Sequence, residues 1–190
     1  MRVALFGGSF NPPHVAHLLA ATWVLAAAPV DELWVAPVWQ HVFGKALGAD
    51  FDQRLALCRL NFALLGPRVR VIDAERGGSG RTLDLLDKLQ QLHPDTQFRL
   101  VIGADILAQA PRWHQFDQVI QRAPALVLGR GGFEIPPQFQ GDVAPVTLPE
   151  LSSSAVRAGL ADGSLPQGWL VREVESEIRR AGLYVSAGTV

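Results

Sequence analysis

The chain has 190 residues, of which 48% are hydrophobic and 18% charged, and its formal net charge is −1. This composition is typical of a folded globular protein and excludes a disordered chain. The near-neutral charge favours neither a nucleic-acid nor a membrane partner. No apolar run is long enough for a signal peptide or a membrane span, so we expect one domain over residues 1–190, in the cytoplasm. The single cysteine, Cys58, excludes an intrachain disulfide.

Short apolar runs alternate along the chain with segments of helical periodicity. The pattern predicts strands over residues 3–6, 33–38, 69–72, 98–102, 125–128 and 143–147, and helices over 15–28, 52–65, 82–92, 153–162 and 172–181. The strands are rich in Val, Leu and Ile without strict alternation, as expected for parallel strands buried on both faces. We therefore predict an α/β fold, with a doubly wound, Rossmann-like parallel sheet and a small C-terminal helical appendage.

A glycine-rich turn with two histidines follows the first predicted strand, over residues 7–17 (GGSFNPPHVAH). Gly7 and Gly8 let the backbone turn sharply and approach a ligand closely. The next helix is expected to begin near residue 13 or 14, and free N–H groups at a helix N-terminus favour a bound anion. His14 and His17 share one face of that helix. By itself the loop predicts an anion site, with a plain structural turn and a metal site as alternatives.

A second polar turn opens the helix predicted over residues 153–162. Ser152, Ser153 and Ser154 place hydroxyl groups and free amides together at its N-terminus. Arg157 lies one turn into the helix, where it can reach an anion bound at that terminus. The alternative interpretation is an ordinary serine cap on a surface helix.

The middle of the chain offers two further candidates. The predicted strand 98–102 is followed by Gly103 and Asp105, and a carboxylate at the carboxyl end of a strand suits ribose hydroxyls. Capping of the following turn is the alternative role for Asp105. Trp113 is either a core residue or a flat surface for a heterocyclic ring.

Residues 7–17 resemble the His-x-Gly-His signature of a nucleotidyltransferase superfamily, with Ala16 in place of the usual glycine. Residues 151–157 (LSSSAVR) are similar to the second signature of that superfamily, Ile-Ser-Ser-Thr-x-Ile-Arg. The resemblance implies that two helix N-termini hold the triphosphate of ATP and stabilise the transition state. The residues implied in ATP binding are Gly7, Gly8, Ser9, Phe10, His14, His17, Gly103, Asp105, Ser152, Ser153, Ser154 and Arg157, with His14, His17 and Arg157 also catalytic.

Residues 82–132 resemble the bacterial nicotinate mononucleotide adenylyltransferases in particular. The resemblance implies that Trp113 stacks on a pyridine ring, that Thr82 contacts its carboxylate and that Arg130 meets the mononucleotide phosphate. Two parts of this sequence depart from the family's pattern. Arg81 stands where the family has tyrosine, and an arginine there could pair with the carboxylate. The loop 39–45 changes the family's Pro-Pro-His-Lys spacing, and we carry over Lys45 as a catalytic phosphate contact, together with His41.

The implied reaction transfers the adenylyl group of ATP to nicotinate mononucleotide and releases pyrophosphate. An acceptor phosphate oxygen attacks the α-phosphorus, so the protein needs no general base. Mg²⁺ would be bound mainly through the ATP phosphates, with no dedicated protein site. The alternatives are a sister transferase for nicotinamide mononucleotide or pantetheine phosphate, and a nucleotide-binding regulator without catalysis. A homo-oligomer is compatible with the sequence.

Overall fold

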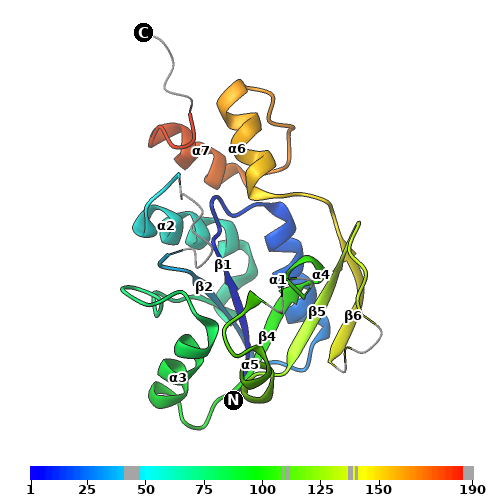
Figure 1. Ribbon diagram of the computed structural model, residues 1–190. Coiled ribbons are helices and arrows are strands. Elements are labelled where there is room, and N and C mark those ends of the chain that lie inside the picture. The colour runs from blue at the N-terminus through cyan, green and yellow to red at the C-terminus, as the bar shows by residue number, and fades with distance from the viewer. Residues whose placement is uncertain (41–47, 108, 110–111, 137–138, 140, 186–190) are drawn as a thin grey trace.

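The computed structural model describes residues 1–40, 48–107, 109, 112–136, 139 and 141–185, and its centre is one six-stranded sheet. The strands are β1 (Arg2–Gly8), β2 (Glu32–Pro37), β3 (Val69–Val71), β4 (Gln97–Gly103), β5 (Ala125–Arg130) and β6 (Asp142–Leu148). All neighbouring strands pair in parallel, in the order β3-β2-β1-β4-β5-β6 (Figure 1). The predicted doubly wound sheet is confirmed. Its order reverses between β1 and β4, and this places the expected crevice at their carboxyl ends.

The helices follow the predicted pattern with two additions. They are α1 (Val15–Ala27), α2 (Phe51–Phe62), α3 (Thr82–Leu92), α4 (Ala104–Leu107), α5 (Phe116–Arg122), α6 (Ser153–Asp162) and α7 (Arg172–Arg180). The short helices α4 and α5 were not predicted, because one or two turns give too little periodicity to recognise. The helix predicted over 52–65 ends earlier, at Phe62, and a 3₁₀ segment, Ala63–Arg68, follows. Gly66 within that segment has a φ of 70° and Pro67 follows it, which prevents a longer α-helix.

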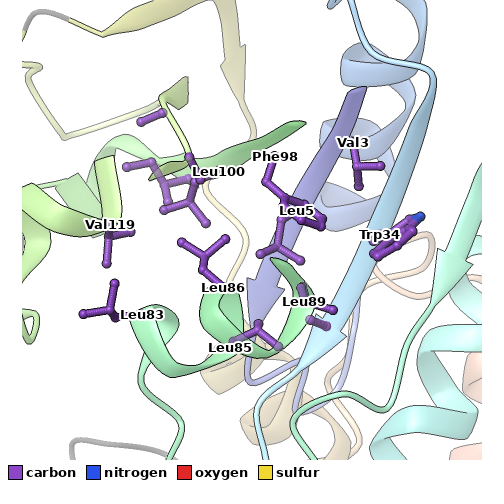
Figure 2. Close-up of a cluster of buried hydrophobic side chains, with 14 of the residues drawn as sticks. Val3, Leu5, Trp34, Leu83, Leu85, Leu86, Leu89, Phe98, Leu100 and Val119 are labelled. Atoms are coloured by element: carbon purple, nitrogen blue, oxygen red, sulfur yellow. The ribbon is translucent and has the colours of Figure 1, made fainter. Parts of the chain in front are cut away.

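Alternate side chains of the central strands supply two separate hydrophobic layers. One layer combines Val3 and Leu5 of β1 with Phe98 and Leu100 of β4, under the leucines of α3 and under α5 (Figure 2). The intervening strand residues face α1 and α2 on the other side of the sheet, where Cys58 is buried. Because both faces are covered, the central strands carry apolar side chains at nearly every position, with Arg99 of β4 paired to Asp142 as an exception.

The two C-terminal helices pack at the end of the sheet toward which β1 runs (Figure 1). Val156 of α6 and Val174 and Ile178 of α7 are buried in one cluster with Leu57 of α2. This cluster is the predicted C-terminal helical appendage. Its position brings the N-terminus of α6 to the carboxyl ends of the strands, although α6 lies more than a hundred residues after β1 in the sequence.

Candidate functional site

A cavity of about 600 Å³ opens at the carboxyl ends of β1 and β4. This volume lies within the range usual for small-molecule sites. The cavity collects most of the predicted site residues: Gly7, Gly8, Ser9, His14, His17, Arg81, Thr82, Gly103, Asp105, Trp113, Arg130, Ser152, Ser153, Ser154 and Arg157. Most of them come from the ends of β1, β4 and β5 and from the starts of α1, α3 and α6, whereas Asp105 belongs to α4 and Trp113 lies between α4 and α5. Both predicted signatures therefore meet in one site.

The two histidines stack on each other at the start of α1, with ring centroids 3.8 Å apart. Burial, reinforced by the positive charge of Arg130, lowers the pKa of His14 to about 3. Burial also lowers the pKa of His17, with further contributions from His14 and Arg130. Nδ1 of His17 accepts a hydrogen bond from the backbone N–H of His14 at 3.1 Å. Both rings are therefore neutral near pH 7, and His17 presents its Nε2–H as a donor for an anion.

His14 has a buried ring nitrogen, Nδ1, with no hydrogen-bond partner among the described residues. An unpaired buried polar atom is costly unless a ligand or water satisfies it. Here it lies in the cavity wall at the helix N-terminus that the sequence identified as an anion site. The position of His14 thus fits a polar ligand at this end of the cavity.

Phe10 has a different place from the other residues implied in ATP binding. Its side chain is 1% exposed and packs in the hydrophobic layer below the loop, against Phe6 and Phe62. The ring also meets His17 edge-on, with centroids 4.9 Å apart. The side chain of Phe10 thus supports the histidine from below and does not line the cavity.

The methyl group of Ala16 fits where the related signature has glycine. Ala16 is 6% exposed, lies at the cavity wall and packs into the cluster formed by α2, α6 and α7. The packing of α6 and α7 therefore accommodates the extra carbon without closing the cavity.

The start of α6 is bonded directly to the first loop. Arg157 donates from Nη1 to the carbonyl of Asn11 at 2.7 Å and from Nη2 to Oγ of Ser154 at 3.2 Å. Ser153 donates from its hydroxyl to the carbonyl of Pro12 at 2.9 Å. Ser152 is the N-cap of α6, and its Oγ accepts from the backbone N–H of Ala155 at 3.2 Å. Two helix N-termini, those of α1 and α6, consequently face the same cavity.

The floor of the cavity holds an ion pair between Asp105 and Arg130. Nη1 of Arg130 donates to Oδ2 of Asp105 at 3.0 Å, and Nη2 donates to the carbonyl of Leu151 at 2.7 Å. The other carboxylate oxygen of Asp105, Oδ1, lies against Gly103. A Cβ atom added to this glycine would clash with Oδ1. Asp105 belongs to α4, and among the described residues its carboxylate is bonded to Arg130. The glycine is needed so that the carboxylate can reach this position.

The opposite end of the cavity is formed by the start of α3 and by Trp113. Arg81 is the N-cap of α3, and its exposed side chain borders the cavity beside Thr82. Trp113 is half-buried and meets Phe116 edge-on, with centroids 5.7 Å apart. The indole is thus held in place by Phe116 while the residue lines the cavity. Lys45 and His41, predicted as phosphate contacts, lie outside the described residues.

Three residues in or directly behind the site belong to no motif that the sequence analysis used to predict a function. Tyr184 donates from its hydroxyl to Oδ1 of Asn11 at 2.8 Å, across 173 positions of sequence. Glu75 is 4% exposed at the cavity wall, and burial raises the pKa of its carboxyl group. Arg54 on α2 is completely buried behind the first loop. A polar residue inside an amphipathic helix or a loop is ordinarily exposed, so only the fold could identify these three.

Neither metal ligation nor membrane insertion is indicated by the described part of the chain. Among those residues, no group of three or more His, Cys, Asp or Glu side chains could hold a metal ion. A search of the same residues finds no helix with the length and apolar character that crossing a membrane requires.

Comparison with known proteins agrees with this geometry. The cytidylyltransferase-like family model matches residues 5–159. The chain belongs to this family. It is 44% identical to a probable nicotinate-nucleotide adenylyltransferase of Anaeromyxobacter sp. (strain K), over 96% of both chains. It is 40% identical to a protein of the same name from Myxococcus xanthus (strain DK1622), over 97% of this chain and 95% of the relative.

A solved structure gives the same result for the fold. The Plasmodium falciparum nicotinic acid mononucleotide adenylyltransferase complexed with NaAD superposes on this family member with a TM-score of 0.81. The two chains are 20% identical, and the match covers 96% of this chain and 97% of the other. The family resemblance drawn from the sequence is confirmed by the family model and the two relatives.

Proposed function

We propose that the protein transfers the adenylyl group of ATP to nicotinate mononucleotide, giving nicotinate adenine dinucleotide and pyrophosphate. The observation that carries the proposal is the meeting of two signature segments on one cavity, fixed by the bond from Arg157 to the carbonyl of Asn11, 146 positions away. The names of the relatives, which match over nearly the full chain, support nicotinate mononucleotide as the acceptor.

The proposed mechanism relies on positioning and on neutralisation of charge. The N–H groups at the starts of α1 and α6 bind the triphosphate, and the neutral imidazole of His17 donates to a phosphate oxygen. Arg157 offers its remaining N–H groups to the departing pyrophosphate. The acceptor phosphate, already anionic near neutral pH, attacks the α-phosphorus in line, and the P–O bond to pyrophosphate breaks. We also assign Lys45 to the phosphates, on the family resemblance alone.

The donor set of the cavity suits a cation that is carried by the nucleotide. The Asp105 carboxylate is paired with Arg130, so the protein presents few oxygen ligands of its own. We propose Mg²⁺, which would reduce the negative charge of the phosphates and keep most of its waters. The residues assigned to the phosphates would hold the nucleotide in place around this cation.

The start of α3 is the proposed site for the acceptor's carboxylate. Free N–H groups of the first turn, next to Thr82, favour an anion, and the side chain of Arg81 can add a charge-assisted bond. Trp113 would stack on the pyridine ring across the cavity. Arg130 is proposed to meet the mononucleotide phosphate from its place beside Asp105.

A transferase of this kind works where ATP is plentiful, so the cytoplasm is the proposed location.

A pyrophosphate-release assay tests the proposal. Purified protein is given ATP, Mg²⁺ and one of three acceptors, which are nicotinate mononucleotide, nicotinamide mononucleotide and pantetheine phosphate. We expect nicotinate mononucleotide to be preferred by ten- to a hundredfold in kcat/KM, because a charge-assisted bond contributes about 1.5–3 kcal/mol. Arg81→Ala should shrink this preference. A preference for the amide would refute the acceptor, and ATP binding without pyrophosphate release would favour a regulator.

A further inference from the structure

Arg54 of α2 is a buried arginine with an unusual set of partners. It is 0% exposed, and its guanidinium donates from Nη1 to the carbonyl of Ser9 at 2.8 Å. Nη2 donates to the carbonyls of Val38 at 2.8 Å and Trp39 at 3.3 Å. No ion pair of Arg54 is found within the part of the chain that the structure describes. Burying a cation without a counter-ion costs free energy of desolvation. The backbone carbonyls that accept its hydrogen bonds offset this cost only when they are held in a fixed position.

The three carbonyls belong to the segments that leave the carboxyl ends of β1 and β2. These strands pair as far as Gly8 and Pro37, and the N–H of Val38 donates to the carbonyl of Gly8 at 2.9 Å. Beyond that bond the two segments diverge, and the guanidinium of Arg54 bridges them. A forked side chain with five N–H donors can do this, whereas an ammonium group has no comparable geometry.

The bond to Ser9 also sets the direction of the next peptide group. Because the peptide is planar and trans, a Ser9 carbonyl that points to Arg54 directs the N–H of Phe10 the opposite way, away from α2. Ser9 lies in the cavity wall, within the loop that leads to the histidines. The orientation of the loop's donors therefore depends on a side chain that does not itself line the cavity.

We propose that Arg54 is a positioning residue for the nucleotide phosphates, which fixes the Ser9 peptide against the end of β2 and leaves the acceptor end unaffected. The inference rests on the proposed use of ATP, but it does not depend on which acceptor is used. The positive charge of Arg54, held behind the loop by three carbonyls and by the ring of Phe51, adds to the attraction for a polyphosphate.

Arg68 provides a control at the amino-terminal end of β2, the end away from the cavity. Its guanidinium likewise donates to three backbone carbonyls, those of Asp31 at 3.0 Å, Leu25 at 3.0 Å and Val30 at 2.9 Å. These carbonyls lie before the start of β2, whereas the cavity lies beyond its end. Arg68 is exposed whereas Arg54 is buried, so Arg68→Lys controls for the loss of a bridge between three carbonyls but not for burial. A merely structural role of Arg54 would raise KM for ATP and KM for the acceptor together, whereas a positioning role raises KM for ATP alone.

The test compares Arg54→Lys, Arg54→Met and Arg68→Lys with the wild type. Two measurements are made, the KM values for ATP and nicotinate mononucleotide, and the rise in melting temperature caused by ATP without acceptor. We expect Arg54→Lys to raise KM for ATP about tenfold, with KM for the acceptor within about twofold of wild type. The ATP-induced rise in melting temperature should shrink in the same variant. Arg68→Lys should change neither quantity.

Several outcomes would overturn the inference. One is an Arg54→Lys variant with wild-type KM for ATP, and another is a variant in which both KM values rise together. If Arg54→Met does not fold, Arg54→Lys still decides the matter because it keeps the charge. The thermal measurement separates the two proposals, since it needs no acceptor. A wild type that binds ATP but releases no pyrophosphate refutes the proposed function alone, whereas one that does not bind ATP refutes both.

Discussion

Each end of the cavity is held in place by a different kind of contact. The loop at the proposed nucleotide end is bonded by side chains that lie 45 to 173 positions away in sequence, namely Arg54, Ser153, Arg157 and Tyr184. The turn before α3, at the proposed acceptor end, is bonded by near neighbours. Ser79 donates from its hydroxyl to Asp84 and accepts from the N–H of Arg81 at 3.1 Å, within five positions.

This difference has a functional meaning. Closing a loop by contacts distant in sequence requires the whole fold, so the nucleotide end can form only once α2, α6 and the C-terminal segment are in place. A locally bonded turn can change its sequence without disturbing the rest of the molecule. The nucleotide end is therefore suited to the chemistry that many transferases share. The acceptor end is suited to the choice of acceptor, which differs among them. The following predictions test that division, beginning with the largest expected effect.

His17→Ala should lower kcat about 10²-fold or more, because it removes a donor directed at the phosphates. The melting temperature should change little, since the ring is only partly buried. Steady-state kinetics and thermal unfolding measure the two quantities. His93→Ala, at the far end of α3, is the control and should keep wild-type turnover. Near wild-type kcat in His17→Ala would remove the nucleotide end from the mechanism.

Arg157→Ala should weaken ATP binding by ten- to a hundredfold, because it removes charge-assisted bonds and releases the carbonyl of Asn11. Arg157→Lys should recover only part of this loss, since lysine lacks the forked set of donors that reaches Asn11 and Ser154 together. Isothermal titration with ATP measures both variants. Complete recovery by lysine would mean that charge alone matters at this position.

His14 should make the protein less stable as the pH falls. Its pKa is about 3 in the folded state against 6.5 for the free side chain, so the unfolded chain binds more protons below pH 6.5. Stability is therefore lost as the pH falls from about 6.5 towards 3. At pH 5 the free energy of unfolding should be about 2 kcal/mol lower than above pH 6.5 because of His14, and His14→Gln should remove this loss. Urea unfolding at pH 5 and pH 7 gives the comparison, and identical pH dependence in the two proteins would contradict the burial argument.

Trp113→Ala should weaken both pyridine acceptors alike, by about tenfold or less, because stacking does not distinguish a carboxylate from an amide. KM for ATP should stay near its wild-type value if the two ends are as separate as their bonding suggests. Acceptor and ATP kinetics in the same variant measure this. A change in the ratio of the two acceptors would show that the tryptophan takes part in selectivity.

The sequence by itself determined the order of the strands and of the longer helices, together with the two signature segments. Each strand from β1 to β6 coincides with a predicted apolar run, and α3 and α6 have the predicted bounds. These features depend on local patterns of hydrophobicity, capping and turn residues, which can be read within a short window. The resemblance to known transferases added proposed roles for His14, His17 and Arg157, all three of which line the cavity.

Only the tertiary structure decided how those residues work together. The lowered pKa of His14 depends on burial and on Arg130, which lies more than a hundred positions away. The inward position of Phe10, the pairing of Asp105 with Arg130 and the bridge made by Arg54 likewise depend on elements distant in sequence. Burial and long-range hydrogen bonds are properties of the packed molecule, because each requires two segments whose contact no local pattern specifies.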